Sequence, residues 1–247
     1  GLVDELPEID TVVDAGAYTP SDTVADPNDP MGTVPGAPPI APGGAFEFEV
    51  EADPGERLSF ASMYVPSNDV FIAPEPAIEL YHDGEPVEGG VAESVSLWDA
   101  GTELNGRPGV DRASAPLQAQ NGGPMAGPEE GVVHRLDTID DGFDYADASE
   151  VVDVAVTHDG DGSFTVRIEN TGPTDFYGDD TATGGQIWIT PGAWAVHTGS
   201  NPIFEQGDPA SVGLEALAEA GPPTGFEGQP GLVDELPEID TVVDAGA

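Results

Sequence analysis

The sequence predicts an all-β protein, an antiparallel β-sandwich with one short helix and an extended N-terminal arm. Apolar and polar residues alternate in several short runs, Gly- and Asp-rich turns separate the runs, and a single stretch near the C-terminal end has helical spacing. Eight or so short strands with turns between them are typical of a sandwich. The hydrophobic fraction of 38%, with 3 Trp, 5 Tyr and 9 Phe, is enough to build a core and favours folding over disorder.

The first predicted strand begins near residue 45. Phe46, Phe48 and Val50 alternate there with glutamates, as in an antiparallel strand with one buried face. An Asp83-Gly84 pair predicts a tight turn. Four further strands are predicted, at residues 58–65, 70–73, 77–82 and 94–98.

The second half of the chain contains the strongest hairpin signal. Alternating runs within residues 151–169 flank the sequence Asp-Gly-Asp-Gly at 159–162, and such turns between alternating runs favour a hairpin. A last pair of strands is predicted at 187–190 and 194–197, and a helix at 213–220. Residues 104–131, rich in Gly, Pro, Asn and Gln, are predicted as a long loop.

The two ends of the chain carry the same 17 residues. The sequence GLVDELPEIDTVVDAGA stands at 1–17 and again, unchanged, at 231–247; both copies are called the repeated segment here. A Pro/Gly/Asp linker (18–44), the sandwich (45–221) and a short tether (222–230) lie between them. The repeat fits a unit of a tandem array, a segment added back at one end without a biological role, or a duplicated docking strand.

The conformation of the repeated segment is ambiguous from its sequence, and we expect it to be extended. Helical spacing and strand alternation both occur in it. The C-terminal copy has the shorter tether, which favours local docking, so we expect it to pack on its own domain and the N-terminal copy to reach a neighbouring subunit. The predicted assembly residues are Leu2, Leu6, Ile9 and Val13 in the first copy and Leu236, Ile239 and Val243 in the second.

The charge is extreme. There are 48 acidic residues against 5 basic ones, for a formal net charge of −43. Such repulsion destabilises a compact state in ordinary buffer but is screened at molar salt, where the Debye length is about 3 Å. We therefore interpret the chain as adapted to high salt. The same charge argues against nucleic-acid and anionic-membrane partners and favours cations as ligands.

Two motifs resemble the spondin domain, a module of secreted proteins. Residues 62–73 read SMYVPSNDVFIA and residues 97–104 read LWDAGTEL, and Trp194 to His197 with the helix at 213–219 add further similarity. The resemblance covers roughly residues 45–221. It implies a C2-like sandwich, an extracellular or cell-surface location, and a calcium site at one end.

The resemblance assigns the calcium ligands to three residues. Asp69 of the SND sequence and Asp99 of WDAGT match its ligand positions, and Glu103 stands where the third acid, usually aspartate, is found. Calcium takes six to eight oxygen ligands with flexible geometry, which suits carboxylates on adjoining loops. Gly101 is expected to let the loop between Asp99 and Glu103 turn.

Other candidate sites are weaker. The Asp-Gly-Asp-Gly sequence lacks the spacing of an EF-hand loop, and the four histidines have no zinc spacing and no cysteines beside them. Trp98 and Trp194 are expected in the core. No nucleophile motif or phosphate-binding loop is present, so we expect no enzyme.

The function predicted from the sequence is that of an extracellular, calcium-binding structural subunit that assembles head to tail into a surface filament in a donor-strand-like manner. Strand addition uses backbone hydrogen bonds at an open sheet edge, and the predicted partners are other copies of the chain. The alternative is a monomeric adhesion module of spondin type that binds glycans or proteins at the cell surface or in the matrix.

Overall fold

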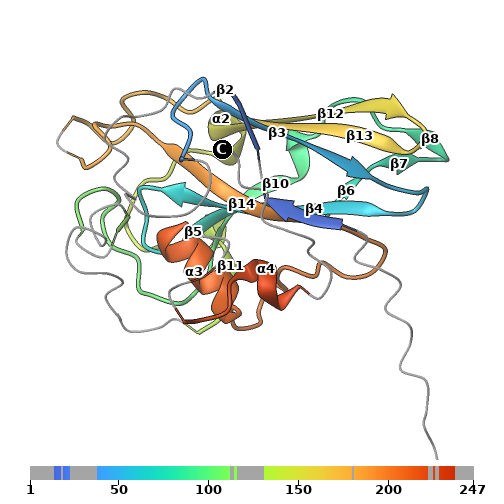
Figure 1. The fold of residues 1–247 in the computed structure, drawn as a ribbon. Coiled ribbons are helices and arrows are strands. Elements are labelled where there is room, and N and C mark those ends of the chain that lie inside the picture. The colour runs from blue at the N-terminus through green and yellow to red at the C-terminus, as the bar shows by residue number, and fades with distance from the viewer. Residues whose placement is uncertain are drawn as a thin grey trace, which may run out of the picture.

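The computed structural model describes residues 14–17, 19–22, 38–111, 114–115, 131–179, 181–221, 225 and 228–236. Two antiparallel sheets lie face to face, and helices α3 and α4 cover the outer face of the larger sheet (Figure 1). The β-sandwich predicted from the sequence is confirmed, and most of its core lies between the two sheets.

The larger sheet has the order β1-β14-β4-β5-β10-β11, and β6 pairs with β4 beside this path. Its strands are β1 (Asp14–Ala17), β4 (Arg57–Val65), β5 (Val70–Pro74), β6 (Ile78–Glu79), β10 (Val95–Asp99), β11 (His134–Arg135) and β14 (Trp188–His197).

The smaller sheet has the order β2-β3-β13-β12-β9. Its strands are β2 (Thr19–Asp22), β3 (Ala45–Glu51), β9 (Gly89–Gly90), β12 (Val152–Gly160) and β13 (Ser163–Asn170). A separate two-stranded ribbon is formed by β7 (Tyr81–His82) and β8 (Glu85–Pro86), which are joined by the Asp83-Gly84 turn. Both residues of that turn have positive φ, as a tight hairpin requires.

Burial differs between the two sheets for a physical reason. Strand β3 alternates buried and exposed residues because only one of its faces meets the core. Strand β4 is buried from Leu58 onward, since the larger sheet is covered on both faces. Along β5, Ile72 faces the inter-sheet core, while Phe71 joins a second core that contains Trp98, Phe204 and the apolar side of α3.

The helices are short. α2 (Ala148–Val151) precedes β12, α3 (Val212–Ala220) follows β14, α4 (Leu232–Glu235) lies against α3, and two 3-10 turns, η1 (Ala92–Ser94) and η2 (Leu136–Thr138), flank β10 and β11. Ser211 accepts a hydrogen bond from the Leu214 N–H and caps α3, and Gly221 ends it in the left-handed conformation. No helix among the described residues is long and apolar enough to cross a membrane.

Several boundaries differ from those predicted. The last two predicted strands are one strand, β14, with an irregularity between Ile189 and Gly192, and the strand predicted at 77–82 is split into β6 and β7. The region predicted as a linker contributes β2 and a buried residue, Ile40, whose backbone bridges Ile189. Tertiary contacts, which local patterns do not reveal, produce these differences.

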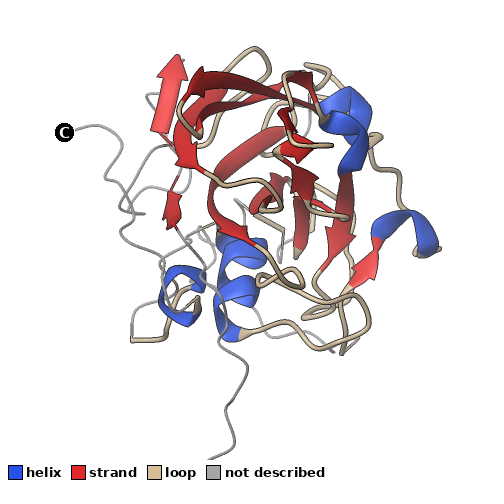
Figure 2. Cartoon of the chain, turned by 90° about the vertical axis from the view of Figure 1, so that its right-hand side faces the viewer, coloured by secondary structure: helices blue, strands red, loops and turns tan. Residues whose placement is uncertain are grey.

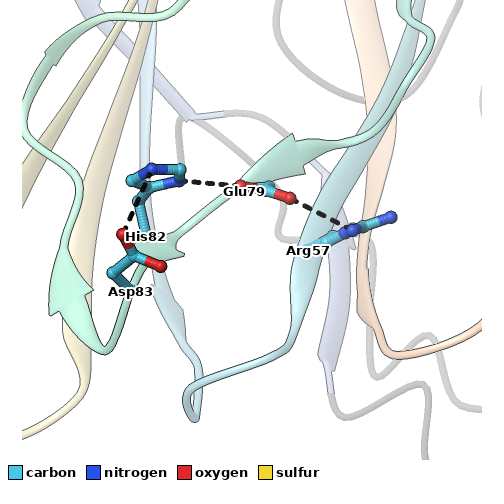
Figure 3. A network of polar contacts seen from close by, with 4 residues as sticks. All are labelled: Arg57, Glu79, His82 and Asp83. Atoms are coloured by element: carbon cyan, nitrogen blue, oxygen red, sulfur yellow. Dashed lines mark hydrogen bonds and ion pairs between the residues drawn. The ribbon is translucent and has the colours of Figure 1, made fainter.

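A polar network lies at the N-terminal end of β4. Arg57 pairs with Glu79, which also contacts His82, and His82 in turn approaches Asp83 (Figure 3). The histidine side chain is 74% exposed, and exposed ion pairs contribute about 0–1 kcal/mol. This network is therefore a surface feature and does not form a candidate site.

Candidate functional site

Asp69 lies in the turn between β4 and β5 and is fully buried. One carboxylate oxygen, Oδ2, accepts hydrogen bonds from the Thr102 backbone N–H (2.9 Å), the Thr102 hydroxyl (3.1 Å) and the Glu103 N–H (3.0 Å). The other oxygen, Oδ1, is buried and has no hydrogen-bond partner among the described residues. A buried carboxylate oxygen without a partner is costly unless a cation or water satisfies it.

Asp99 ends β10 and is also fully buried. Its Oδ1 accepts a hydrogen bond from the Gly101 N–H at 2.7 Å, and its Oδ2 accepts one from the side-chain amide of Asn105. The amide oxygen of Asn105 is itself buried without a hydrogen-bond partner in the described part of the chain. Asn105 therefore adds a second oxygen atom that is free to bind a cation.

Gly101 is required by the path of this loop. Its φ is 68°, in the left-handed region, and a Cβ at this position would lie 2.2 Å from the backbone oxygen of Val132. No other residue could take its place without moving the neighbouring segment. The sequence prediction that this glycine lets the loop turn is confirmed.

Glu103 follows on the same loop and is 3% exposed, and Glu219 of α3 is 4% exposed. Burial raises the pKa of Glu219 to about 8, and the charges of Glu103 and Asp69 contribute in the same direction. Burial raises the pKa of Asp69 to about 6, the hydrogen bonds from Glu103 and Thr102 oppose this, and the charge of Glu103 adds to it. Four acids, including Asp99, thus gather at one end of the sandwich, and we call them the acidic cluster.

Gathering these acids makes the domain sensitive to pH. Asp69 and Glu219 have ordinary pKa values of 3.8 and 4.5, so the folded state favours their protonated forms. The stability that protonation provides is fully present below these ordinary values and is lost as the pH rises through about 6 for Asp69 and about 8 for Glu219. A bound cation would offset the loss because it favours the ionised carboxylates.

The three predicted calcium ligands therefore lie near one another. Within the described ranges, however, no group of three or more His, Asp or Glu residues is already arranged to hold a metal ion. The donor set still fits a hard cation, because the site offers carboxylate and amide oxygens, two of them without hydrogen-bond partners. Calcium, which tolerates irregular oxygen geometry, matches these donors better than magnesium does.

Sequence reasoning missed two members of the site. Glu219 belongs to a helix whose pattern is that of an ordinary amphipathic element, and only its burial among the other acids distinguishes it. Asn105 opens the long loop predicted at 104–131, where the sequence gives no sign that it turns back onto Asp99. Nothing in the local pattern of either residue indicates these contacts.

Asn68 fixes the loop that carries Asn105. Its side-chain oxygen accepts hydrogen bonds from the Gly106 N–H (3.3 Å) and the Ser114 hydroxyl (3.0 Å), and its amide donates to the Leu104 carbonyl at 3.3 Å. Both residues before β5, Asn68 and Asp69, thus hold the segments that surround the acidic cluster. The SND sequence thus has a structural role at this end of the sandwich.

A polar cavity of about 370 Å³ opens between β10, η2 and α2. Leu97, Arg135, Ile139 and Tyr145 are among the residues that line it. The pKa of the Tyr145 hydroxyl is raised, mainly by burial and next by the charge of Asp141. The charges of Asp99 and Asp69 raise it further. Tyr145 lines the cavity, and its hydroxyl is also influenced by the charges of two members of the acidic cluster.

The predicted assembly residues have different outcomes. Leu236 is buried, as is Leu232 of the same copy, and both belong to the second core beneath α3. The expectation that the repeated segment is extended is wrong for residues 232–235, which form α4, whereas residues 14–17 form strand β1 on β14 of the same chain. The remaining assembly residues, Leu2, Leu6, Ile9, Val13, Ile239 and Val243, lie outside the described residues.

Comparisons with known proteins give no relative. No protein-family model matches the chain, and neither the curated proteins nor the solved structures contain a match. The resemblance to the spondin domain therefore depends on the motif residues alone.

Proposed function

We propose that the chain is an extracellular, calcium-binding structural subunit that assembles head to tail into a surface filament. The observation that carries the proposal is the pairing of β1 with β14, in which a strand of the repeated segment completes the edge of the larger sheet. A second copy of the same four residues, Asp-Ala-Gly-Ala, stands at 244–247. Every chain therefore contains two identical four-residue sequences, either of which could pair with the edge of β14.

Strand addition suits this edge physically. The residues from Ala193 to Val196 pair with β1, and the start of β14 is bridged by Ile40 through two backbone hydrogen bonds of 2.8 and 3.0 Å. Without β1, the outer half of β14 would be an open edge, which invites pairing with another chain. Because the pairing uses backbone groups, the same strand from a neighbouring chain would fit equally well.

Head-to-tail exchange of such a strand generates open assemblies. Each subunit would donate one strand and accept another, and a contact of this kind builds a fibre when its rotation does not close a ring. Exchange replaces one set of contacts by an identical set, so dilute chains favour pairing within one molecule. Assembly is therefore expected at the high local concentrations of a cell surface.

Cysteine cross-linking tests whether the strand crosses between chains. The chain has no cysteine of its own, and Ala15 lies opposite Ala195 in the β1–β14 register. Chains carrying only Ala195→Cys, mixed in high salt with chains carrying only Ala15→Cys or only Ala245→Cys, should form disulfide-linked pairs under mild oxidation. The faster mixture identifies the copy that donates the strand.

A matched control measures random collisions. Asp83→Cys places a thiol on an exposed turn outside the β1–β14 pairing, on a side chain that is 94% exposed. If both strand mixtures cross-link no faster than Asp83→Cys chains mixed with Ala195→Cys chains, strand exchange is excluded. Efficient closure within the Ala15→Cys/Ala195→Cys double variant would then show that β1 stays in its own chain.

The calcium part of the proposal is supported by the acidic cluster. Its members come from the turn before β5, the end of β10 with the loop that follows it, and helix α3, so one cation would join three separate segments. The Oδ1 atom of Asp69 and the amide oxygen of Asn105 are the oxygens available to it. Binding there would stabilise the end of the sandwich that also carries α3.

The alternative function, a monomeric adhesion module, is favoured by a different observation. The cavity beside Tyr145 combines an arginine with apolar and acidic residues, a mixture that suits a polar ligand. A monomer that fails to cross-link but retains calcium binding would favour this alternative.

A further inference from the structure

We infer that a groove along α3 is a docking site for the hexapeptide GLVDEL, and that residues 1–6 of a second copy of this chain can occupy it. The groove is now filled by residues 231–236, which have the same sequence. The inference rests on the proposed self-assembly and deepens it, because it assigns a second docking surface to the same repeated segment.

The groove is formed by an apolar surface beneath and beside α3. Leu232 and Leu236 are 1% and 6% exposed, and they belong to one core with Leu214, Leu217 and Phe204. Figure 2 shows both helices on the outer side of the larger sheet. Two leucines four positions apart thus anchor the hexapeptide, as in other helix-in-groove contacts.

Two glycines allow the hexapeptide backbone to come close. A Cβ on Gly213 would lie 2.2 Å from the backbone nitrogen of Leu232, and one on Gly225 would lie 2.6 Å from that of Gly231. Gly213 lies inside α3, where alanine would otherwise be the better helix former. The glycine at this position is therefore explained by the docked segment rather than by the helix.

A carboxylate of the hexapeptide completes the N-terminal end of α3. Glu235 Oε1 accepts a hydrogen bond from the Gly213 N–H at 2.9 Å, beside the cap that Ser211 provides for Leu214. An acid at this position also interacts favourably with the helix dipole. The groove thus binds three side chains of the hexapeptide, two leucines and one glutamate. Residues 1–6 contain the same three side chains, as Leu2, Leu6 and Glu5.

The two docking surfaces take different halves of the repeated segment. In the isolated chain, β14 is paired with the last four residues of the N-terminal copy, and α3 is packed against the first six of the C-terminal copy. A single copy could therefore join two domains, its hexapeptide on one and its final tetrapeptide on the next. The same junction would arise in a covalent tandem array and in a filament of separate chains.

Peptide binding tests the groove directly. We would use the full chain with Leu2, Leu6, Leu232 and Leu236 all changed to Asp, so that neither of its own hexapeptides can dock. A labelled synthetic peptide, GLVDELPEIDTVVDAGA, should bind this variant in molar salt. A peptide with both leucines replaced by aspartate should bind at least about a hundredfold more weakly, because each buried leucine contributes more than a tenfold effect.

The substitution Gly213→Ala provides a second measurement, which remains informative if the quadruple variant does not fold. Added to that variant, it should remove peptide binding. In the otherwise native chain it should keep α3 helical but speed proteolysis within residues 231–247, whereas Gly90→Ala, at an exposed and open position of the smaller sheet, should not. Absence of peptide binding to a folded quadruple variant, or unchanged proteolysis in Gly213→Ala, would overturn the inference.

Failure of this inference can be distinguished from failure of the proposed function. If the peptide binds but β14 does not cross-link, the groove inference stands and strand exchange is rejected. If β14 cross-links but the peptide does not bind, strand exchange stands and residues 231–236 are only a packed tail of their own chain.

Discussion

In dilute buffer without divalent cations the purified chain is expected to lose its β-sheet circular dichroism, and it should recover the signal at 3–4 M salt. The reason is the formal net charge of −43, spread over a domain with only five arginines. Strand β3 alone presents Glu47, Glu49 and Glu51 on its exposed face. At molar salt the Debye length is about 3 Å, which screens repulsion between such neighbours.

Sucrose provides the control for this prediction. It strengthens effective burial by exclusion from the surface but does not screen charge. Equal recovery in sucrose and in salt would attribute the effect to general stabilisation. A spectrum that is unchanged in dilute buffer would contradict adaptation to high salt.

Calcium is expected to raise the melting temperature of the native chain by about 5–10 °C at one hundred times its dissociation constant. Binding to the native state at that concentration contributes about 2.7 kcal/mol, and a domain of this size gains about 2–4 °C per kcal/mol. The expected effect of Asp99→Asn is loss of most of this shift. The substitution keeps an oxygen that can accept from the Gly101 N–H, so the loop is preserved while the charge is removed.

Two controls sharpen the calcium measurement. Asp153→Asn removes one charge from an exposed position of β12 and should leave the calcium shift unchanged. Lowering the pH to 5 should weaken the response of the native chain, because burial raises the pKa of Asp69 to about 6 and a proton then competes with the ion. An equal shift in the native chain and Asp99→Asn would place the ion elsewhere.

The strands that were predicted well are those whose own sequence determines their burial. Strand β3 alternates because one face is exposed, and the β12–β13 hairpin turns at Asp161 and Gly162, both of which have positive φ. Helix α3 was predicted from Leu214 and Leu217. In these elements local pattern and tertiary environment agree.

The elements that could not be predicted depend on distant partners. Residues 14–17 have little intrinsic preference for a strand, and the open edge of β14 gives them one. The first half of the same repeated segment is helical at 232–235 because it packs against Gly213 and Leu214. The two described parts of the repeated segment, 14–17 in one copy and 231–236 in the other, thus have different conformations, each determined by the surface that it meets.

The motifs predicted three acids that the structure places near one another, but they did not indicate the fourth. Asp69, Asp99 and Glu103 are close together and buried. Glu219 belongs to helix α3 and lies 116 positions after Glu103 in the chain. Only the packing of α3 on the larger sheet brings it there. A sequence pattern cannot report such a long-range contact.

Electron microscopy of the native chain tests the central claim, head-to-tail assembly, most directly. We would concentrate the protein in 3–4 M salt with calcium and image it beside a variant in which Ala15, Gly16 and their counterparts Ala245 and Gly246 are all changed to Pro, which removes backbone donors from both copies of the donated strand and leaves β14 intact. We expect unbranched filaments of one width from the native chain, and separate particles from this folded fourfold proline variant. Separate, monomeric particles of the native chain at every concentration would contradict the account.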